Sequence, residues 1–220
     1  MQSPGSLWSR VGGVLFDFDG VLADSESLFR KTWNEAIKPR SPIPEDEYFR
    51  RWSFLGEGMN HLTEMGFSDR DVPILRQRQR ALYAKLCAEG AVTLFPETRE
   101  LLEWVSRRKP CAIASNTDSD LVISVLSAAG VPAPVVVGGE GLRPKPHPDI
   151  FLRASSILGV PPEGCLVVED AWKGVEAARR GGFQALLVRT PYNAGMDAGN
   201  VPEAAGLSGL SAAWRREDGK

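Results

Sequence analysis

VGGVLFDFDGVLADSE, residues Val11–Glu26, is the stretch that decides the fold. Its first half, Val11–Phe18, is a short apolar run leading into acid and glycine, which is typical of a strand buried in a parallel sheet. Similar runs follow at Cys111–Ser115, Pro134–Gly139, Cys165–Asp170 and Ala185–Thr190. Segments with helical spacing separate these runs, at residues 98–108, 118–130, 147–159 and 171–182. The alternation predicts an α/β fold with a Rossmann-like parallel sheet covered on both faces.

One stretch interrupts the alternation. Residues 25–90 contain no convincing strand, and segments with helical patterns fill them, at 28–37, 46–52, 57–66 and 72–90. A proline-rich loop, Pro39–Pro44, links the first two. We therefore expect residues 1–24 and 91–220 to form the α/β core, with a small all-helical domain of residues 25–90 inserted after the first strand. Beyond Pro191 the chain is rich in Gly and Ala, and we expect loops with at most one short terminal element.

Composition excludes several classes of protein. Of 220 residues, 43% are hydrophobic and 25% charged, which argues against a disordered or fibrous chain. No apolar run is long enough to span a bilayer, so we expect no membrane association. Lys and Arg number 26 against 28 Asp and Glu, and this net charge of -2 provides no general attraction for nucleic acid. The local basic run Arg76–Arg80 is expected to be a solvated helix face.

Cysteine usage and the N-terminus favour a cytoplasmic protein. Cys87, Cys111 and Cys165 are odd in number and widely spaced, which fits a reducing compartment and buried thiols. The first ten residues lack the basic and apolar regions of a signal peptide. No assembly signal is evident, and we expect a monomer.

Polar residues gather where the expected strands end, and the carboxyl ends of parallel strands share one edge of a sheet. They are Asp17 and Asp19, Ser115 and Asn116, Lys145, and Glu169 with Asp170. Carboxylates packed together repel one another unless a cation lies among them, and Mg²⁺ prefers such oxygen ligands together with phosphate. With the added positive charge of Lys145, the edge is suited to a phosphoryl group.

The order and spacing of these groups resemble the haloacid dehalogenase-like hydrolase superfamily. The resemblance covers Val11 to about Arg189, and its most specific part is the first motif, Asp17–Glu26, which reads DFDGVLADSE. The inserted helices resemble the cap domain of the branch that includes phosphoglycolate phosphatases and β-phosphoglucomutases.

The resemblance implies a role for each residue. Asp17 would be the nucleophile that forms an aspartyl-phosphate, and Asp19 the general acid and then base. Asp17, Asp170 and the backbone carbonyl of Asp19 would hold Mg²⁺, with Glu169 binding directly or through water. Three further groups would hold the phosphoryl oxygens, namely the Ser115 hydroxyl, the Asn116 backbone and Lys145.

Several residues also have plain structural interpretations. Asp24 and Ser25 are expected to cap a helix that has Glu26 in its first turn. For Asn116 the structural and functional interpretations are evenly balanced. His147 is expected to cap the next helix, and His61 to be a surface or packing residue. The aromatic residues Trp33, Trp52 and Phe54 are expected mostly to pack within the helical domain rather than to face substrate.

The favoured function is a Mg²⁺-dependent phosphatase for a small phosphorylated metabolite, with a sugar phosphate the leading class by resemblance. A phosphomutase is the main alternative. The β-phosphoglucomutase-like members carry a His on the first cap helix, where this chain has Phe29, and an Arg in a cap loop. Here the matching loop, Leu55–Met59, has no Arg or Lys, although Arg50 and Arg51 lie just upstream. A dehalogenase needs no second acid, and a non-catalytic regulator would not need the acids and lysine that are present.

Overall fold

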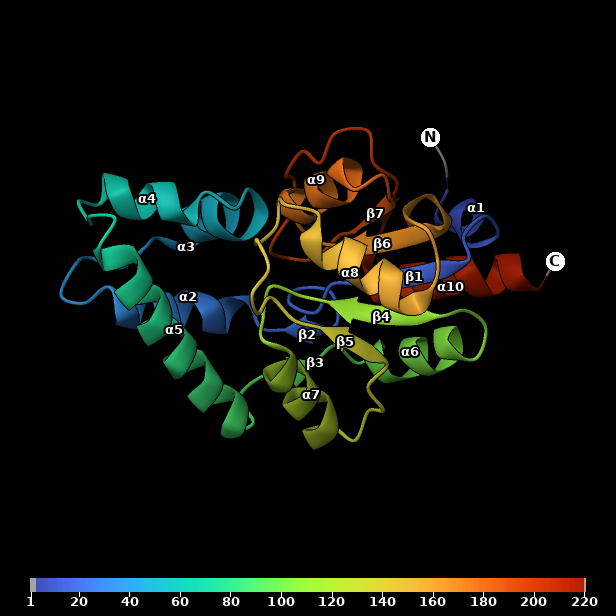
Figure 1. Ribbon diagram of the computed structural model, residues 1–220, viewed down its shortest axis with the longest axis horizontal. Coiled ribbons are helices and arrows are strands. Elements are labelled where there is room, and N and C mark those ends of the chain that lie inside the picture. Colours follow the sequence, from blue (N-terminus) through green and yellow to red (C-terminus); the bar gives the residue numbers. More distant parts are fainter. Residues whose placement is uncertain (1–2, 220) are drawn as a thin grey trace.

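Six parallel strands form the central sheet of the computed structural model, which describes residues 3–219 (Figure 1). Their order is β5-β4-β1-β6-β7-β8. The strands are β1 (Gly13–Phe16), β4 (Cys111–Ala114), β5 (Val135–Val137), β6 (Cys165–Glu169), β7 (Gln184–Val188) and β8 (Glu203–Ala204). Every residue of β1, β4 and β6 is buried, as expected for strands covered on both faces. The α/β fold with a parallel sheet, predicted from the sequence, is confirmed.

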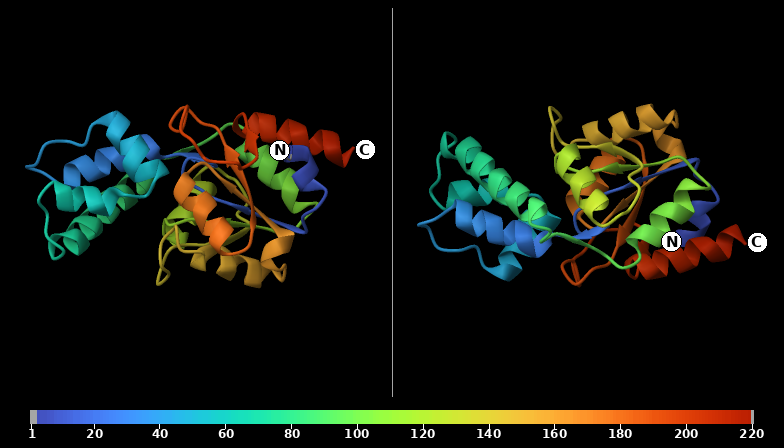
Figure 2. Two further views of the ribbon diagram at one scale, coloured as in Figure 1. Left: turned by 90° about the horizontal axis from the view of Figure 1, so that it is seen from above. Right: turned by 90° about the horizontal axis from the view of Figure 1, so that it is seen from below.

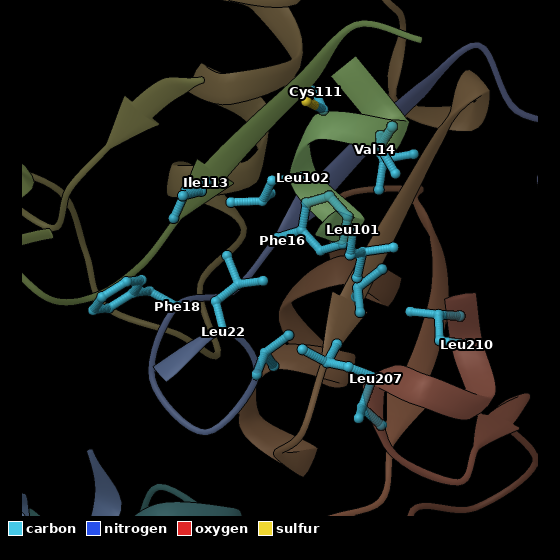
Figure 3. Close-up of a cluster of buried hydrophobic side chains, with 14 of the residues drawn as sticks. Val14, Phe16, Phe18, Leu22, Leu101, Leu102, Cys111, Ile113, Leu207 and Leu210 are labelled. Atoms are coloured by element: carbon cyan, nitrogen blue, oxygen red, sulfur yellow. The ribbon is translucent and has the colours of Figure 1, made fainter. Parts of the chain in front are cut away.

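Alternate side chains of the strands enter two separate hydrophobic clusters, one on each face of the sheet. Val14 and Phe16 of β1 join one cluster with α6 (Thr98–Ser106), α7 (Ser119–Ala128) and the C-terminal helix α10 (Gly206–Asp218). Figure 3 shows the part of this cluster around Phe16, Leu101 and Leu210. Leu15, between them, joins the other cluster with α8 (Asp149–Leu158) and α9 (Trp172–Arg180). This two-sided packing fixes the edge of the sheet where the strands end.

The C-terminal tail has more structure than the sequence indicated. It adds the edge strand β8 and the 13-residue helix α10, which packs against the N-terminal helix α1 (Pro4–Trp8). Leu207, Leu210 and Trp214 are buried at helical spacing, and Trp214 stacks on Trp8 with ring centroids 5.1 Å apart. The expectation of loops with at most one short element is therefore wrong, because the apolar spacing within a Gly- and Ala-rich segment was overlooked.

The inserted residues form a helical unit, α2–α5, that lies to one side of the sheet (Figures 1 and 2). It comprises α2 (Glu26–Ala36), α3 (Glu45–Glu47), the π-helix η1 (Tyr48–Phe54), α4 (Gly58–Glu64) and α5 (Asp71–Ala88). Two short antiparallel strands, β2 (Ala23–Asp24) and β3 (Thr93–Leu94), connect the unit to the α/β core. A short 3₁₀ turn, η2 (Pro162–Gly164), precedes β6. The predicted all-helical insertion after the first strand is confirmed.

Aromatic and histidine side chains of the helical unit divide into two groups. Trp33 and Trp52 belong to the unit's own cluster, and His61 is buried there, its Nδ1 accepting a 2.9 Å hydrogen bond from the Trp52 indole. These packing interpretations are confirmed. Phe54 differs, because it packs against the α/β core beside Ala171 and other buried residues. The helical unit therefore contacts the core directly through the end of η1.

No helix in residues 3–219 combines the length and apolarity that crossing a membrane requires.

Candidate active site

The end of β1 places Asp17 and Asp19 at the edge of the sheet. The backbone N–H of Asp17 donates to the Val168 carbonyl at 2.9 Å, which continues the pairing of β1 with β6. Asp17 is buried, whereas Asp19 is partly exposed. Gly20 then turns the chain with a φ of 77°, a conformation that favours glycine. A Cβ at Gly20 would overlap the carboxylate of Asp170, so the turn also needs glycine for space.

Lys145 lies between two carboxylates. Its Nζ is 2.9 Å from Asp17 Oδ1 and donates to Glu169 Oε1 at 2.6 Å, and all three side chains are buried. Burial alone would lower the pKa of Lys145, but Asp17 and Glu169 raise it above its usual value. Lys145 is therefore a fixed positive charge beside Asp17. Gly174, at the start of α9, leaves the space that the Glu169 carboxylate occupies, and a Cβ there would overlap it.

Asp17, Glu169 and Asp170 form a buried carboxylate cluster, with one oxygen of each lying within 4.8 Å of the others. Burial and the charge of Asp17 together raise the pKa of Glu169 to about 7, against the opposing effect of Lys145. Burial and the neighbouring acids Glu26 and Glu169 also raise the pKa of Asp170. Asp17 Oδ1 contacts the Lys145 ammonium group at 2.9 Å, and no other donor within residues 3–219 forms a hydrogen bond with it.

These features fit a divalent cation. One lysine does not balance three carboxylates, and hard oxygen ligands with an open lone pair are the donors that Mg²⁺ prefers. The cluster combines Asp17 with Glu169 and Asp170, which the sequence placed at the ends of neighbouring strands. These three acids are among those expected from the sequence to bind a metal ion. The Asp19 carboxylate instead accepts hydrogen bonds from hydroxyl groups.

Four hydroxyl groups surround the carboxylate of Asp19. Ser25 and Tyr83 donate to Oδ1 at 2.7 and 3.2 Å, and Ser115 and Thr117 donate to Oδ2 at 3.0 and 2.6 Å. Burial and the charge of Asp17 raise the pKa of Asp19, while three of the hydroxyls lower it in part. A carboxyl group with a raised pKa that hydrogen bonds hold in place is suited to proton transfer.

The predicted capping role of Ser25 needs a correction. Ser25 does precede α2, but its hydroxyl makes no cap hydrogen bond and donates to Asp19 instead. Asp24 is also not the cap, because it lies in β2 and its carboxylate accepts from Tyr192. His147 likewise does not cap the next helix, since Pro148 takes that position before α8.

Ser115 and Asn116 lie at the site, after β4, but their side chains contact protein groups. The Ser115 hydroxyl donates to Asp19 and accepts a 3.0 Å hydrogen bond from the backbone of Thr117. The amide oxygen of Asn116 accepts a 3.2 Å hydrogen bond from the backbone N–H of Lys145, which ties the two loops together. The side chain of Asn116 therefore has a structural contact, and its backbone is the part left for a ligand.

Several residues at the site escaped the sequence interpretation, and Glu26 is the most informative. It is 6% exposed, and burial raises its pKa to about 7 against the opposing charge of Lys173. Its position three residues before Phe29 and seven before Trp33 places it on the inward face of α2, a spacing that could have identified it. Lys173 extends from α9 to the Trp52 carbonyl at 3.4 Å, so this charge lies between core and helical unit.

Asn193 is a second missed residue, and it acts on the backbone of the site. Its buried amide donates to the carbonyls of Asp170 and Val188, at 2.7 and 2.9 Å. These bonds tie the end of β6 to the end of β7 and hold Asp170 in place. Nothing in the local sequence around Asn193 indicates this contact, because it depends on a loop 23 residues away.

The haloacid dehalogenase-like hydrolase family matches residues 11–182 of the chain. The chain belongs to this family, which confirms both the resemblance and the expectation of a hydrolase. Hexitol phosphatase A of Escherichia coli (strain K12) is 30% identical over 83% of this chain and 85% of its own length. Protein SUPPRESSOR OF QUENCHING 1, chloroplastic, of Arabidopsis thaliana is 33% identical over 83% of this chain, which spans only 18% of that protein.

Among solved structures, CbbY from Rhodobacter sphaeroides in complex with phosphate matches with a TM-score of 0.74. It is 24% identical and the match covers 91% of this chain and 99% of that one. At this identity the likeness concerns the fold, and it includes both the sheet and the inserted helices.

Proposed function

We propose that this protein is a Mg²⁺-dependent phosphatase that hydrolyses a small phosphorylated metabolite through an aspartyl-phosphate at Asp17. The phosphatases among the relatives make phosphoric monoester hydrolysis the reaction class. The observation that carries the proposal is the buried cluster of Asp17, Glu169 and Asp170 with Lys145 beside it. A divalent cation held by these carboxylates, together with Lys145, would stabilise the negative charge that a phosphoryl group brings to the edge of the sheet.

The residues divide the chemistry between them. Asp17 attacks phosphorus and the ester oxygen leaves, taking a proton from Asp19. Asp19 then removes a proton from water, which attacks the aspartyl-phosphate and releases inorganic phosphate. Lys145, the Ser115 hydroxyl and the Asn116 backbone hold the phosphoryl oxygens. Asp17, Asp170 and the backbone carbonyl of Asp19 would hold Mg²⁺, with Glu169 binding directly or through water, and the ion would neutralise charge on the phosphoryl oxygens.

The helical unit, residues 25–90, would act as a cap that excludes water and selects the leaving group. In support, Phe54 packs into the α/β core, and Arg80 of α5 forms an ion pair with Asp118 at the start of α7. Glu26 and Lys173 are two charged side chains on this side that the phosphoryl chemistry does not use. A carboxylate and an ammonium group suit hydroxyl-rich substrates, which agrees with a sugar or sugar-alcohol phosphate.

A phosphomutase is the second candidate, and the contacts of Arg51 count against it. A mutase needs a cation that holds the second phosphate of a bisphosphate. Arg51 is engaged by Glu64 at 2.7 Å and by Glu47 and Glu57 at 3.4 Å each, so three carboxylates already compensate its charge. Glu57 itself belongs to the loop where the clamp would lie. Phe29, moreover, cannot exchange a proton with Asp19.

Two measurements test the proposal. Turnover of p-nitrophenyl phosphate is expected with Mg²⁺ and not with EDTA, and a screen of phosphorylated metabolites then gives the substrate. Phosphorus NMR on β-glucose 1-phosphate, with a trace of the 1,6-bisphosphate, separates the two candidates. Inorganic phosphate is expected to form first. Accumulation of glucose 6-phosphate ahead of it would show that the protein is a mutase and not a phosphatase.

A further inference from the structure

Tyr83 is the partner of Asp19 that comes from α5, the last helix of the helical unit, and its ring packs in the same hydrophobic cluster as β1. It lies in α5, 64 residues along the chain from Asp19, and its hydroxyl donates to Asp19 Oδ1 at 3.2 Å. Ser115 and Thr117 come from the α/β core, and Ser25 from the junction with α2. The steps of phosphoryl transfer described above do not use Tyr83.

The ring of Tyr83 is held firmly. It is 2% exposed and stacks on Phe29 of α2, with ring centroids 4.0 Å apart and an angle of 18° between planes. One turn earlier in α5, Gln79 donates a buried 2.9 Å hydrogen bond to Thr32 of α2. The stacking and the helix pairing leave the phenol little freedom, so the direction of its hydroxyl is determined by how α2 and α5 pack.

A hydroxyl suits a proton-transfer partner for a chemical reason. It donates to a carboxylate and accepts from a carboxylic acid, so it holds Asp19 in both of the protonation states that the reaction requires. Ser115 and Thr117 hold Oδ2 of Asp19. Ser25 and Tyr83 together hold Oδ1, and Tyr83 is the donor that comes from α5.

We propose that Tyr83 is a positioning residue, which orients Asp19 for proton transfer to the leaving group. The inference rests on the proposed function, in which Asp19 is the general acid. A purely structural role would instead use Asp19 only to satisfy a buried phenol hydroxyl.

Tyr83→Phe tests the proposal, because it keeps the ring on Phe29 and removes the hydroxyl. The assay compares p-nitrophenyl phosphate, whose leaving group needs little protonation, with the best alkyl phosphate from the metabolite screen. For the alkyl phosphate we expect kcat to fall about tenfold or more, with KM changed less than about twofold. For p-nitrophenyl phosphate we expect kcat to fall less than about threefold.

Gln79→Met is the matched control. It removes a buried hydrogen bond between the same two helices and does not reach Asp19, so the ratio of the two kcat values should match that of the wild type. Phe29→Leu, which keeps the hydroxyl but removes its stacking partner, should change the ratio in the same direction and by less. It also serves as the test if Tyr83→Phe does not fold.

The possible failures are distinct. If Tyr83→Phe lowers kcat equally for the two substrates, or if its ratio of the two kcat values equals that of Gln79→Met, the positioning role alone is overturned. A wild-type protein that hydrolyses no phosphate ester with Mg²⁺ overturns the proposed function, and the positioning role with it.

Discussion

Glu26 offers a sharp test of the electrostatics of the site, through the change Glu26→Gln. Burial raises the pKa of Glu26 from 4.5 to about 7, and the charges of Asp19 and Asp17 contribute. Because the folded-state pKa lies above that of the unfolded chain, the folded state binds the extra proton. The resulting stabilisation is complete below about pH 4.5 and is lost as the pH rises through about 7. Gln has no proton to lose, so the variant does not share this loss.

The size of the effect follows from the pKa. A shift from 4.5 to about 7 corresponds to roughly 3 kcal/mol at full ionisation, of which about 2–3 kcal/mol develops between pH 5 and pH 8. The free energy of unfolding of Glu26→Gln, minus that of the wild type, should therefore increase by this amount over that range. A change in the free energy of unfolding that the substitution causes equally at every pH cancels, because only the variation of the difference with pH is measured.

Urea unfolding at pH 5, 6, 7 and 8, in the presence of EDTA, measures this difference. Glu176→Gln is the matched control, because Arg179 and Arg180 lower the pKa of Glu176 to about 2 and it stays ionised throughout. Its difference from the wild type should be flat over the same range. A flat difference for Glu26→Gln as well would refute the reasoning, since it would mean that Glu26 ionises in the folded protein as it does in water.

Three further predictions concern the catalytic groups. Asp17→Asn should abolish turnover of p-nitrophenyl phosphate while the circular dichroism spectrum stays that of the wild type, because an amide cannot attack phosphorus; near-normal turnover would rule out the covalent mechanism. Asp19→Asn should lose roughly 10²–10⁴ in rate, and more for an alkyl phosphate than for p-nitrophenyl phosphate, whereas equal losses would make Asp19 structural. Gly174→Ala should place a methyl group where the Glu169 carboxylate lies, and we expect turnover to fall about 10²-fold. Helix α9 should remain folded, because alanine favours a helix. Full activity in that variant would show that Glu169 can move without consequence.

The sequence predicted the parts of the fold and site that follow from local pattern. Apolar runs with acids at their ends identify β1 and β6, and parallel pairing then requires Asp17, Glu169 and Asp170 to meet. Lys145 was predicted for a similar reason, because it lies in the loop that follows β5. These residues are adjacent to the elements that position them, and a single sequence contains that information.

Other contacts depend on packing between distant elements and were not predictable in the same way. Ser25 has the position of a helix cap, and only its distance from Asp19 shows that its hydroxyl has another partner. Glu26 was expected only as an acid in the first turn of a helix, and nothing in the sequence singled it out as buried, since Glu rarely is. Tyr83 gives no sign of its role, since Asp19 lies 64 residues away, beyond β2, α2, α3, η1 and α4.

The residues around the reacting centre come from two different parts of the fold. The nucleophile, the carboxylate cluster and Lys145 all come from strand ends of the α/β core, where sheet packing fixes them. Two side chains that face the reacting centre from the other side, Glu26 and Tyr83, come from the helical unit. Substitutions in that unit can therefore alter which leaving group is held and protonated while leaving the attack on phosphorus unchanged. A fold arranged in this way can change substrate without rebuilding its catalytic edge, because most of the helical unit packs in a cluster of its own, while Tyr83 joins the cluster of β1.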